Sequence, residues 1–232
     1  MPPHAAPANP LSLLTVRYLV ISDIHADIEA LNRVLDHAGS STWDRTVFLG
    51  DVIGYGHEPE AAVRKLMELD PYVTLKGNHE HAALLAPRHS AYGPGGRHEH
   101  AAMLSPESLD FLASFKERHV DEAWAAVHGS PRNPMEYLVS IPVARANLSH
   151  MERHLYFVGH THVASAFVYD ERDEARPWRA HAFRRPHTRI HLSEGTSAFI
   201  NPGSVSQPRD GTPRAAYAIF DETERTLDAY RI

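Results

Sequence analysis

Short apolar runs alternate with amphipathic stretches along the first half of the chain. Residues 16–21, 46–49 and 72–75 have the length and the apolar, partly β-branched content that is typical of buried strands. Between them, apolar residues recur at helical spacing over residues 28–39 and again from Pro59 onward. Strands that alternate with helices at this spacing predict an α/β architecture with a largely parallel sheet.

The second half of the chain has a different pattern of apolar and polar residues. Residues 81–100 are rich in histidine, glycine and proline, which predicts a loop or lid, and a helix is expected to start at Ser105. Two more strands are predicted at residues 123–127 and 155–158, and from residue 164 onward the pattern favours strands alone. These last strands are expected at residues 164–169, 188–192, 197–200, 215–220 and 226–230.

Nothing in the sequence resembles a linker or an internal repeat. We therefore expect a single domain over residues 15–232, with a lid or insertion at about residues 81–118. Residues 1–14 are expected to form a flexible tail. The opening MPPHAAPANP lacks the basic start and apolar core of a signal peptide, which favours a cytoplasmic protein.

The composition narrows the classes of protein and of site. The chain has no cysteine, which excludes a disulfide scaffold, a cysteine-ligated metal and a cysteine nucleophile. Its formal net charge of -6 argues against duplex nucleic acid as a partner. No stretch reaches the roughly 18 consecutive apolar residues of a membrane span. Because the chain has 18 histidines, any metal site would use nitrogen and oxygen donors.

Five short segments place such donors just beyond the ends of predicted buried strands. In an open α/β sheet the carboxyl ends of the strands line one crevice, so these segments can converge. Residues i and i+2 of an extended chain point the same way, which lets both side chains of Asp-x-His or His-x-His reach one ion. The segments are Asp23-Ile24-His25, Gly50-Asp51, Gly77-Asn78-His79, His128-Gly129 and Gly159-His160-Thr161-His162.

The number of donors favours two ions. Two carboxylates, one amide oxygen and four imidazoles make seven ligands, with His79 left over. Seven are too many for one four- or five-coordinate transition metal, but they suffice for two if one carboxylate bridges. Without soft ligands, the site suits Mn, Fe, Ni, Co or Zn.

The five segments together resemble the signature of the calcineurin-like metallophosphoesterase superfamily, which is DxH, GD, GNH, a lone H, and GHxH. The sequences around these motifs are most similar to the small prokaryotic phosphodiesterase branch of the superfamily, namely SDIHAD, GDVIGYG, GNHE, HGSP and NPGSVSQPRDG. The resemblance covers roughly residues 16–232. It implies an α/β fold that is a four-layer sandwich of two mixed β-sheets flanked by helices.

The resemblance also implies a ligand for each position. Asp23, His25 and His162 would hold one divalent ion, Asn78, His128 and His160 would hold a second, and Asp51 would bridge them, with Mn favoured. His79 would contact the phosphate as an electrostatic stabiliser or general acid, and Arg132 and Arg209 are further candidates for substrate contact together with Asn78. The implied reaction is hydrolysis of a small phosphodiester or nucleotide by direct attack of a metal-bridging hydroxide. Asp27 and Glu80 are candidates either for orienting ligand histidines or for capping helices.

Two other functions remain open at this point. A phosphoprotein phosphatase or dinucleoside tetraphosphate hydrolase shares GNHE, but its usual GDxVDRG has no counterpart for the arginine in Gly50-Asp51-Val52-Ile53-Gly54-Tyr55-Gly56. A non-catalytic scaffold on the same fold would be expected to have lost catalytic histidines, whereas all are present here. The sequence does not distinguish diester from monoester, the natural substrate, the native metal or the oligomeric state.

Overall fold

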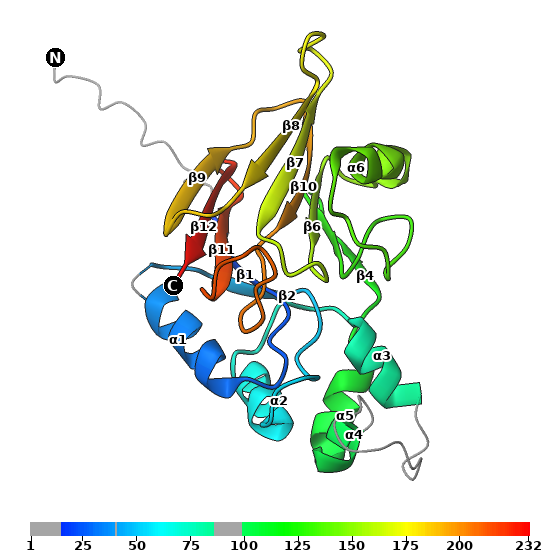
Figure 1. Ribbon diagram of the computed structural model, residues 1–232, viewed down its shortest axis with the longest axis vertical. Helices are drawn as coiled ribbons and strands as arrows, with labels where there is room; N and C mark the ends of the chain where they lie inside the picture. Colours follow the sequence, from blue (N-terminus) through cyan, green and yellow to red (C-terminus); the bar gives the residue numbers. More distant parts are fainter. Residues whose placement is uncertain (1–14, 40, 86–98) are drawn as a thin grey trace, which may run out of the picture.

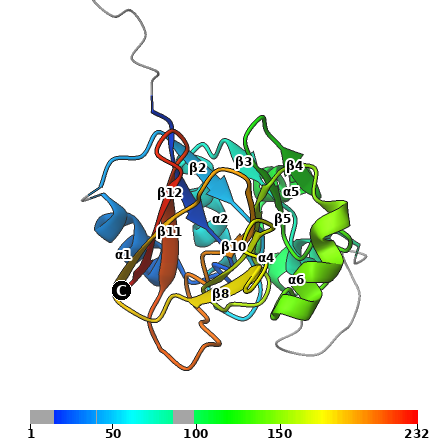
Figure 2. The same cartoon turned by 90° about the horizontal axis from the view of Figure 1, so that it is seen from above.

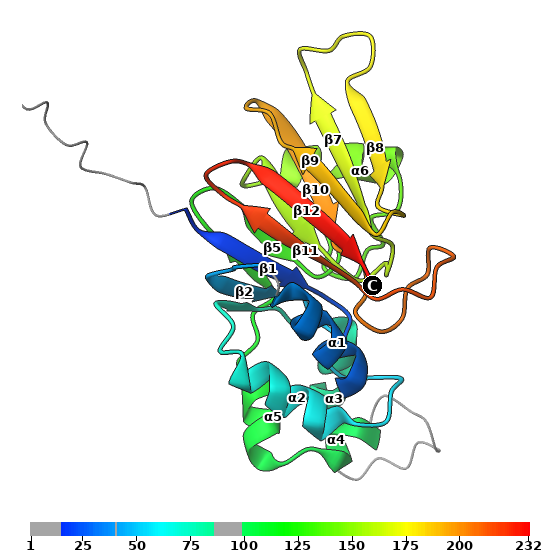
Figure 3. The ribbon, with the colours of Figure 1, turned by 90° about the vertical axis from the view of Figure 1, so that its left-hand side faces the viewer.

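The computed structural model describes residues 15–39, 41–85 and 99–232. Two mixed six-stranded sheets stack face to face, and helices cover their outer faces (Figures 1 and 3). The strands of the first sheet are β1 (Arg17–Ile21), β2 (Arg45–Phe48), β3 (Val73–Thr74), β9 (His187–His191), β11 (Ala216–Asp221) and β12 (Thr226–Arg231). Those of the second are β4 (Arg118–Val120), β5 (Ala125–Val127), β6 (Leu155–Val158), β7 (Ser165–Asp170), β8 (Trp178–Ala182) and β10 (Thr196–Asn201).

The helices lie on opposite sides of this pair of sheets. They are α1 (Ile28–Ala38), α2 (Pro59–Glu68), α3 (Asn78–Leu85), α4 (Glu99–Met103), α5 (Pro106–Ala113) and α6 (Ile141–Asn147), which a 3-10 turn (Leu148–His150) follows. Helices α1 and α2 cover the first sheet, while α6 covers the second (Figures 1 and 2). No helix among the described residues is long and apolar enough to cross a bilayer.

Alternation along the strands explains why four layers form. Tyr18 and Val20 of β1 face the core between the two sheets, whereas Leu19 and Ile21 face the core under α1 and α2. Successive side chains of a strand point to opposite faces, so a strand that is apolar at every position must be covered on both sides. β1 is therefore buried on both faces, and so are its neighbours β2 and β11.

The sheet order brings the ends of the parallel strands together. In the first sheet (β3-β2-β1-β11-β12-β9), β1, β2 and β3 are parallel, and the other pairings are antiparallel. In the second sheet (β4-β5-β6-β10-β7-β8), β5, β6 and β10 are parallel. All of the candidate ligand segments follow the carboxyl ends of β1, β2, β3, β5 and β6.

The fold class is as expected, and three local expectations need correction. The sheets are mixed rather than largely parallel, because β11 returns antiparallel to β1. Strands β4 and β8 and helix α6 occur where no element was predicted. Helix α3 runs to Leu85 and α4 starts at Glu99, so the predicted loop at 81–100 is wrong at both ends. Residues 86–98 of that lid and the tail at 1–14 lie outside the described residues, and the lid's role stays a prediction.

Candidate metal centre

Backbone hydrogen bonds hold the loops after the parallel strands against one another. The Asp23 amide donates to the Gly50 carbonyl at 2.9 Å, and the His25 amide donates to the Asp51 carbonyl at 3.0 Å. The loop of the second sheet joins them, because the His160 amide donates to Asp23 Oδ2 at 3.2 Å. Residues that lie far apart in the sequence thus meet at one edge of the stacked sheets.

The backbone of this edge is strained at the candidate ligands themselves. Among the described residues, nine that are not glycine have φ between +44° and +65°. L-residues rarely adopt this left-handed region, and where they do the strain commonly marks a functional site. Five of the nine are predicted metal ligands, namely Asp23, His25, Asp51, His160 and His162.

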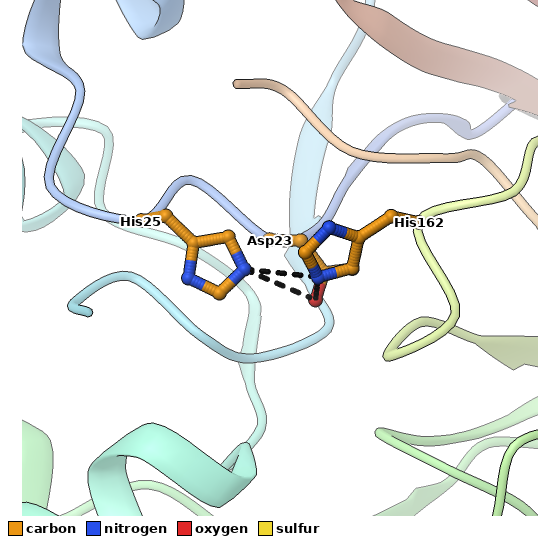
Figure 4. Close-up of side chains that lie close together, drawn as sticks. All are labelled: Asp23, His25 and His162. Carbon is orange, nitrogen blue, oxygen red and sulfur yellow. Dashed lines mark hydrogen bonds and ion pairs between the residues drawn. The ribbon is translucent and has the colours of Figure 1, made fainter. Parts of the chain in front are cut away.

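The first cluster consists of Asp23, His25 and His162, which point toward one another (Figure 4). The Nε2 atoms of His25 and His162 are 3.0 Å apart, and Asp23 Oδ1 lies 3.3 Å from His162 Nε2. All three residues are buried, and Asp23 Oδ1 has no hydrogen-bond partner among the described residues. A buried carboxylate oxygen that accepts no hydrogen bond is costly unless a cation or proton lies beside it.

The second cluster consists of Asp51, His128 and His160. His128 Nε2 is 3.1 Å from His160 Nδ1 and 3.3 Å from Asp51 Oδ2. Asp51 also forms a close group with His25 and His79, so its carboxylate lies between the two clusters. The Asp51 carboxylate is therefore close to possible ligand atoms of both clusters, and its bridging role stays a prediction.

Backbone carbonyls fix which ring nitrogen of three histidines faces the clusters. Because a carbonyl only accepts, each of the three Nδ1 atoms carries the proton, and the Nε2 lone pair is left for a cation. The Nδ1 partners are the carbonyls of Ile53 for His25 at 3.1 Å, Leu49 for His128 at 2.8 Å and Gln207 for His162 at 2.6 Å. Inward-facing lone pairs and an orphaned carboxylate oxygen fit a pair of divalent ions.

The electrostatics of the two clusters differ. Burial lowers the pKa of both His25 and His160 to about 4, so both imidazoles are neutral and ready to ligate near pH 7. Burial would also lower the pKa of His128, but the Asp51 carboxylate outweighs this effect and raises that pKa to about 9. Burial would raise the pKa of Asp51, and His128 beside it holds that pKa well below its usual range instead.

This difference predicts stepwise loss of metal on acidification. A cation at the second cluster must displace the His128 proton below about pH 9, whereas His25 needs no deprotonation above about pH 5. Between about pH 8 and about pH 6, proton competition at His128 should lower the apparent affinity of the second cluster about 100-fold, whereas His25 adds no such loss at the first cluster. Two-site metal titrations across this range measure both affinities; simultaneous loss of both ions would contradict the assignment.

His79 and Asn78 lie at the start of α3, beside Asp51. The His79 amide donates to Asp51 Oδ1 at 2.9 Å, and the His79 ring lies 5.0 Å from the ring of His25, centroid to centroid. His79 is 2% exposed, and Asn78 before it is half-buried. Gly54 has φ +96° and a Cβ there would overlap the His79 ring, so that position requires glycine.

Glu80 caps α3 and holds the Asp51 loop. Its carboxylate accepts hydrogen bonds from the amides of Gly77 at 2.8 Å, Asp51 at 2.8 Å and Val52 at 2.9 Å. The bond from Gly77 is the backward half of a capping box. Asp27 likewise accepts a hydrogen bond from the Ala30 amide at 2.8 Å at the start of α1. Helix capping, rather than orientation of a ligand histidine, therefore describes the contacts of both Asp27 and Glu80.

The two candidate arginines are placed differently. Arg132 is exposed, and its guanidinium pairs with Glu136 through Nε at 2.9 and 3.1 Å. Arg209 lies beside the first cluster, where its backbone amide donates a hydrogen bond to the His162 carbonyl at 3.0 Å. Its guanidinium lies 6.0 Å from the ring of Tyr55.

Two tyrosines next to the clusters received no role from the sequence. Tyr55 lies 4.8 Å from the His25 ring, and Tyr137 lies 4.1 Å from the His160 ring, centroid to centroid. Tyr55 stands within the Gly50–Gly56 motif, so its position was a usable signal. Tyr137 follows His128 by nine residues without any pattern that would single it out.

The comparisons with known proteins identify the family. Residues 16–225 match the model of the calcineurin-like phosphoesterase superfamily domain. An uncharacterized protein of Methanocaldococcus jannaschii is 30% identical over 220 residues, which cover 92% of this chain and 86% of that protein. The chain belongs to the calcineurin-like phosphoesterase superfamily, a family that depends on divalent metals.

Solved structures agree with this assignment. A metallophosphoesterase from Sphaerobacter thermophilus superposes with a TM-score of 0.83 at 35% identity, covering 94% of this chain and 88% of that one. A hypothetical protein from Pyrococcus horikoshii shares the fold, with a TM-score of 0.68 at 14% identity and coverage of 94% and 88%. Family, fold and clustered ligands together support a metal-dependent hydrolase of phosphoric esters.

Proposed function

We propose that this protein is a dinuclear phosphodiesterase for small phosphodiesters or nucleotides. The observation that carries the proposal is the position of the Asp51 carboxylate, which is grouped with His128 and His160 on one side and with His25 on the other. A carboxylate shared between two clusters is the arrangement expected of a bridging ligand. Asp23, His25 and His162 would hold one ion, and Asn78, His128 and His160 the other, with Mn²⁺ favoured among metals that accept nitrogen and oxygen donors.

The chain contributes positioning and proton transfer. When bound, the two ions would supply an activated water and neutralise charge on the phosphate oxygens. The Leu49, Ile53 and Gln207 carbonyls keep the ligand histidines in the tautomer that this requires. The His79 imidazole would hold a proton for the departing alkoxide oxygen, while its amide orients Asp51 through Oδ1.

Charge at the site favours a diester over a monoester. A monoester dianion carries more negative charge than a diester, and its hydrolysis benefits from more cationic anchors. Tyr55 stands where the phosphatase motif GDxVDRG has its arginine. Of the two arginines predicted to contact the substrate, Arg132 is already paired with Glu136, which leaves Arg209.

The test compares two chromogenic esters with the same leaving group. Chelator-stripped protein should hydrolyse neither bis-p-nitrophenyl phosphate nor p-nitrophenyl phosphate. Adding Mn²⁺ back should restore diester hydrolysis with kcat/KM at least about tenfold above that of the monoester. Fe²⁺, Ni²⁺, Co²⁺, Zn²⁺ and Mg²⁺ are compared in parallel to rank the metals.

Two outcomes would overturn the proposal. Restored activity on the monoester alone would shift the function to a phosphatase. Binding of two ions without turnover of either ester, or of a panel of nucleotide diesters, would favour the non-catalytic scaffold.

A further inference from the structure

One exposed tyrosine ring lies beside each of the two clusters of candidate metal ligands. Tyr137 is stacked on His160 of the second cluster, with ring centroids 4.1 Å apart and planes 7° from parallel. Tyr55 meets His25 of the first cluster edge-on at 4.8 Å, and His79 at the same distance. Tyr55 is 51% exposed and Tyr137 is 47% exposed, so burial in the core does not account for the positions of the two rings.

The Tyr137 ring is held in place by the residue before it. The Glu136 carboxylate accepts hydrogen bonds from Ser130 Oγ at 2.7 Å, Asn147 Nδ2 at 2.9 Å and Arg132 Nε at 2.9 Å. Hydrogen bonding from Arg132 in particular lowers the pKa of Glu136 to about 2, which keeps it ionised. These bonds tie the loop that carries Tyr137 to helix α6 through Asn147, and the ring itself packs against His160.

The Tyr55 ring is held by a strained backbone. Tyr55 has φ +61°, a conformation that costs free energy for a residue with a Cβ. On either side of it, the Gly54 amide donates to His100 Nδ1 at 2.9 Å and the Gly56 amide donates to the His25 carbonyl at 3.0 Å. With the Arg209 guanidinium 6.0 Å from its centroid, the ring forms an aromatic and cationic surface beside the first cluster.

We propose that Tyr55 and Tyr137 bind planar rings on the two sides of the phosphate, so that the substrate is a short dinucleotide-like phosphodiester. The proposal rests on the phosphodiesterase function proposed above and narrows its substrate class. Rigid, exposed tyrosines are the usual stacking surfaces for nucleobases because they lose little conformational entropy on binding. With one ring at each cluster and Asp51 between the clusters, a phosphate at the ions would have one ring on either side.

Binding measurements test the proposal without depending on turnover. The metal-loaded protein is titrated calorimetrically with a dithymidine phosphorothioate, a slowly hydrolysed dinucleotide, and with dimethyl phosphate, which has no ring. The dinucleotide should bind at least about 10-fold more tightly than dimethyl phosphate, and Tyr55→Leu and Tyr137→Leu should each weaken it about 10- to 100-fold. Phenylalanine at either position should restore binding to within about twofold, since the ring face is retained.

The control is Tyr72→Leu, which removes an exposed tyrosine that lies away from the site. Tyr72 is 41% exposed but precedes β3, and its hydroxyl donates to Asp121 at 2.8 Å, outside both clusters. Dimethyl phosphate affinity and bound metal should be unchanged in every variant. Wild-type dinucleotide affinity in both leucine variants would overturn the proposal. An equal loss for dimethyl phosphate would overturn it too, because the tyrosines would then only support the ligand histidines.

A kinetic comparison separates this proposal from the proposed function. Thymidine 5′-(p-nitrophenyl phosphate) and methyl p-nitrophenyl phosphate share a leaving group and differ in the ring. The wild type should favour the thymidine ester, and the preference should fall in the leucine variants. If neither ester is hydrolysed while dinucleotide binding still depends on the two rings, the phosphodiesterase function fails and the stacking site stands.

Discussion

Replacing Asp51 by asparagine is expected to lower kcat/KM for a phosphodiester by about 10³-fold or more, and to remove at least one bound ion. The Asp51 carboxylate is 1% exposed, with Oδ2 3.3 Å from His128 Nε2 and Oδ1 accepting the His79 amide at 2.9 Å. Asparagine keeps the size of the side chain but turns one oxygen into an NH₂ group, which cannot ligate a cation. Loss of even one preorganised electrostatic contact costs about 10²–10³-fold.

The control for this variant is Asp228→Asn. Asp228 is also buried, at 4% exposed, but its carboxylate pairs with Arg189 at 2.7 and 2.8 Å and with His187 at 2.6 Å, away from both clusters. We expect Asp228→Asn to retain two ions per chain and near wild-type turnover. Metal content, circular dichroism and diester kinetics are measured for both variants. An Asp51→Asn protein with two ions and turnover within about threefold of wild type would show that Asp51 does not bridge.

The convergence of the candidate ligand residues was predictable because β1, β2 and β3 are adjacent in the sheet in the same order as in the sequence. Each ligand segment directly follows a short buried strand, and strands β1, β2 and β3 pair in parallel with their carboxyl ends together. A polar residue such as Asp51 after the apolar run of β2 is visible in the sequence. Its approach to His128 across the two sheets is not, because it depends on how the sheets stack.

The helices and strands that the sequence did not predict lack a periodic pattern of apolar residues. Strand β8 has no buried residue, so no period of two appears in WRAHA. In α3, two of the three buried residues are His79 and Glu80, which are polar, so its buried face does not appear as an apolar stripe. Tertiary contacts make this burial favourable, because the Glu80 carboxylate accepts hydrogen bonds from three amides of the Asp51 loop as well as from the Gly77 amide.

Backbone groups at the centre also escape prediction from side-chain types. The carbonyls of Leu49, Ile53 and Gln207 set the histidine tautomers, yet any residue has a carbonyl. The pairing of β1 with β11 joins residues about 200 positions apart in the sequence, through the register of Tyr18 with Phe220. No local periodicity encodes such a partner, which is why a largely parallel sheet was expected and a mixed one formed.

Replacing His79 by alanine is expected to lower kcat about 10²–10⁴-fold while both ions stay bound. The imidazole is 2% exposed and packs against the rings of both His25 and Tyr55, where it would hold a proton for the leaving oxygen. The loss should be larger for a phenyl or methyl ester than for a p-nitrophenyl ester. p-Nitrophenolate is stable as an anion and leaves without protonation, whereas the poorer leaving groups need the acid.

The dependence on leaving group distinguishes a proton donor from a ligand. The structure groups His79 with His25 and Asp51 closely enough to share a cation, so both roles have a geometric basis. A ligand's removal would release metal and slow every ester alike, which would contradict our assignment. His119→Ala is the matched control, because that imidazole also packs against two aromatic rings, those of Tyr72 at 5.5 Å and Trp124 at 5.2 Å, outside both clusters. It should change neither metal content nor the dependence of rate on leaving group, so a slope altered only in His79→Ala assigns the proton transfer to His79.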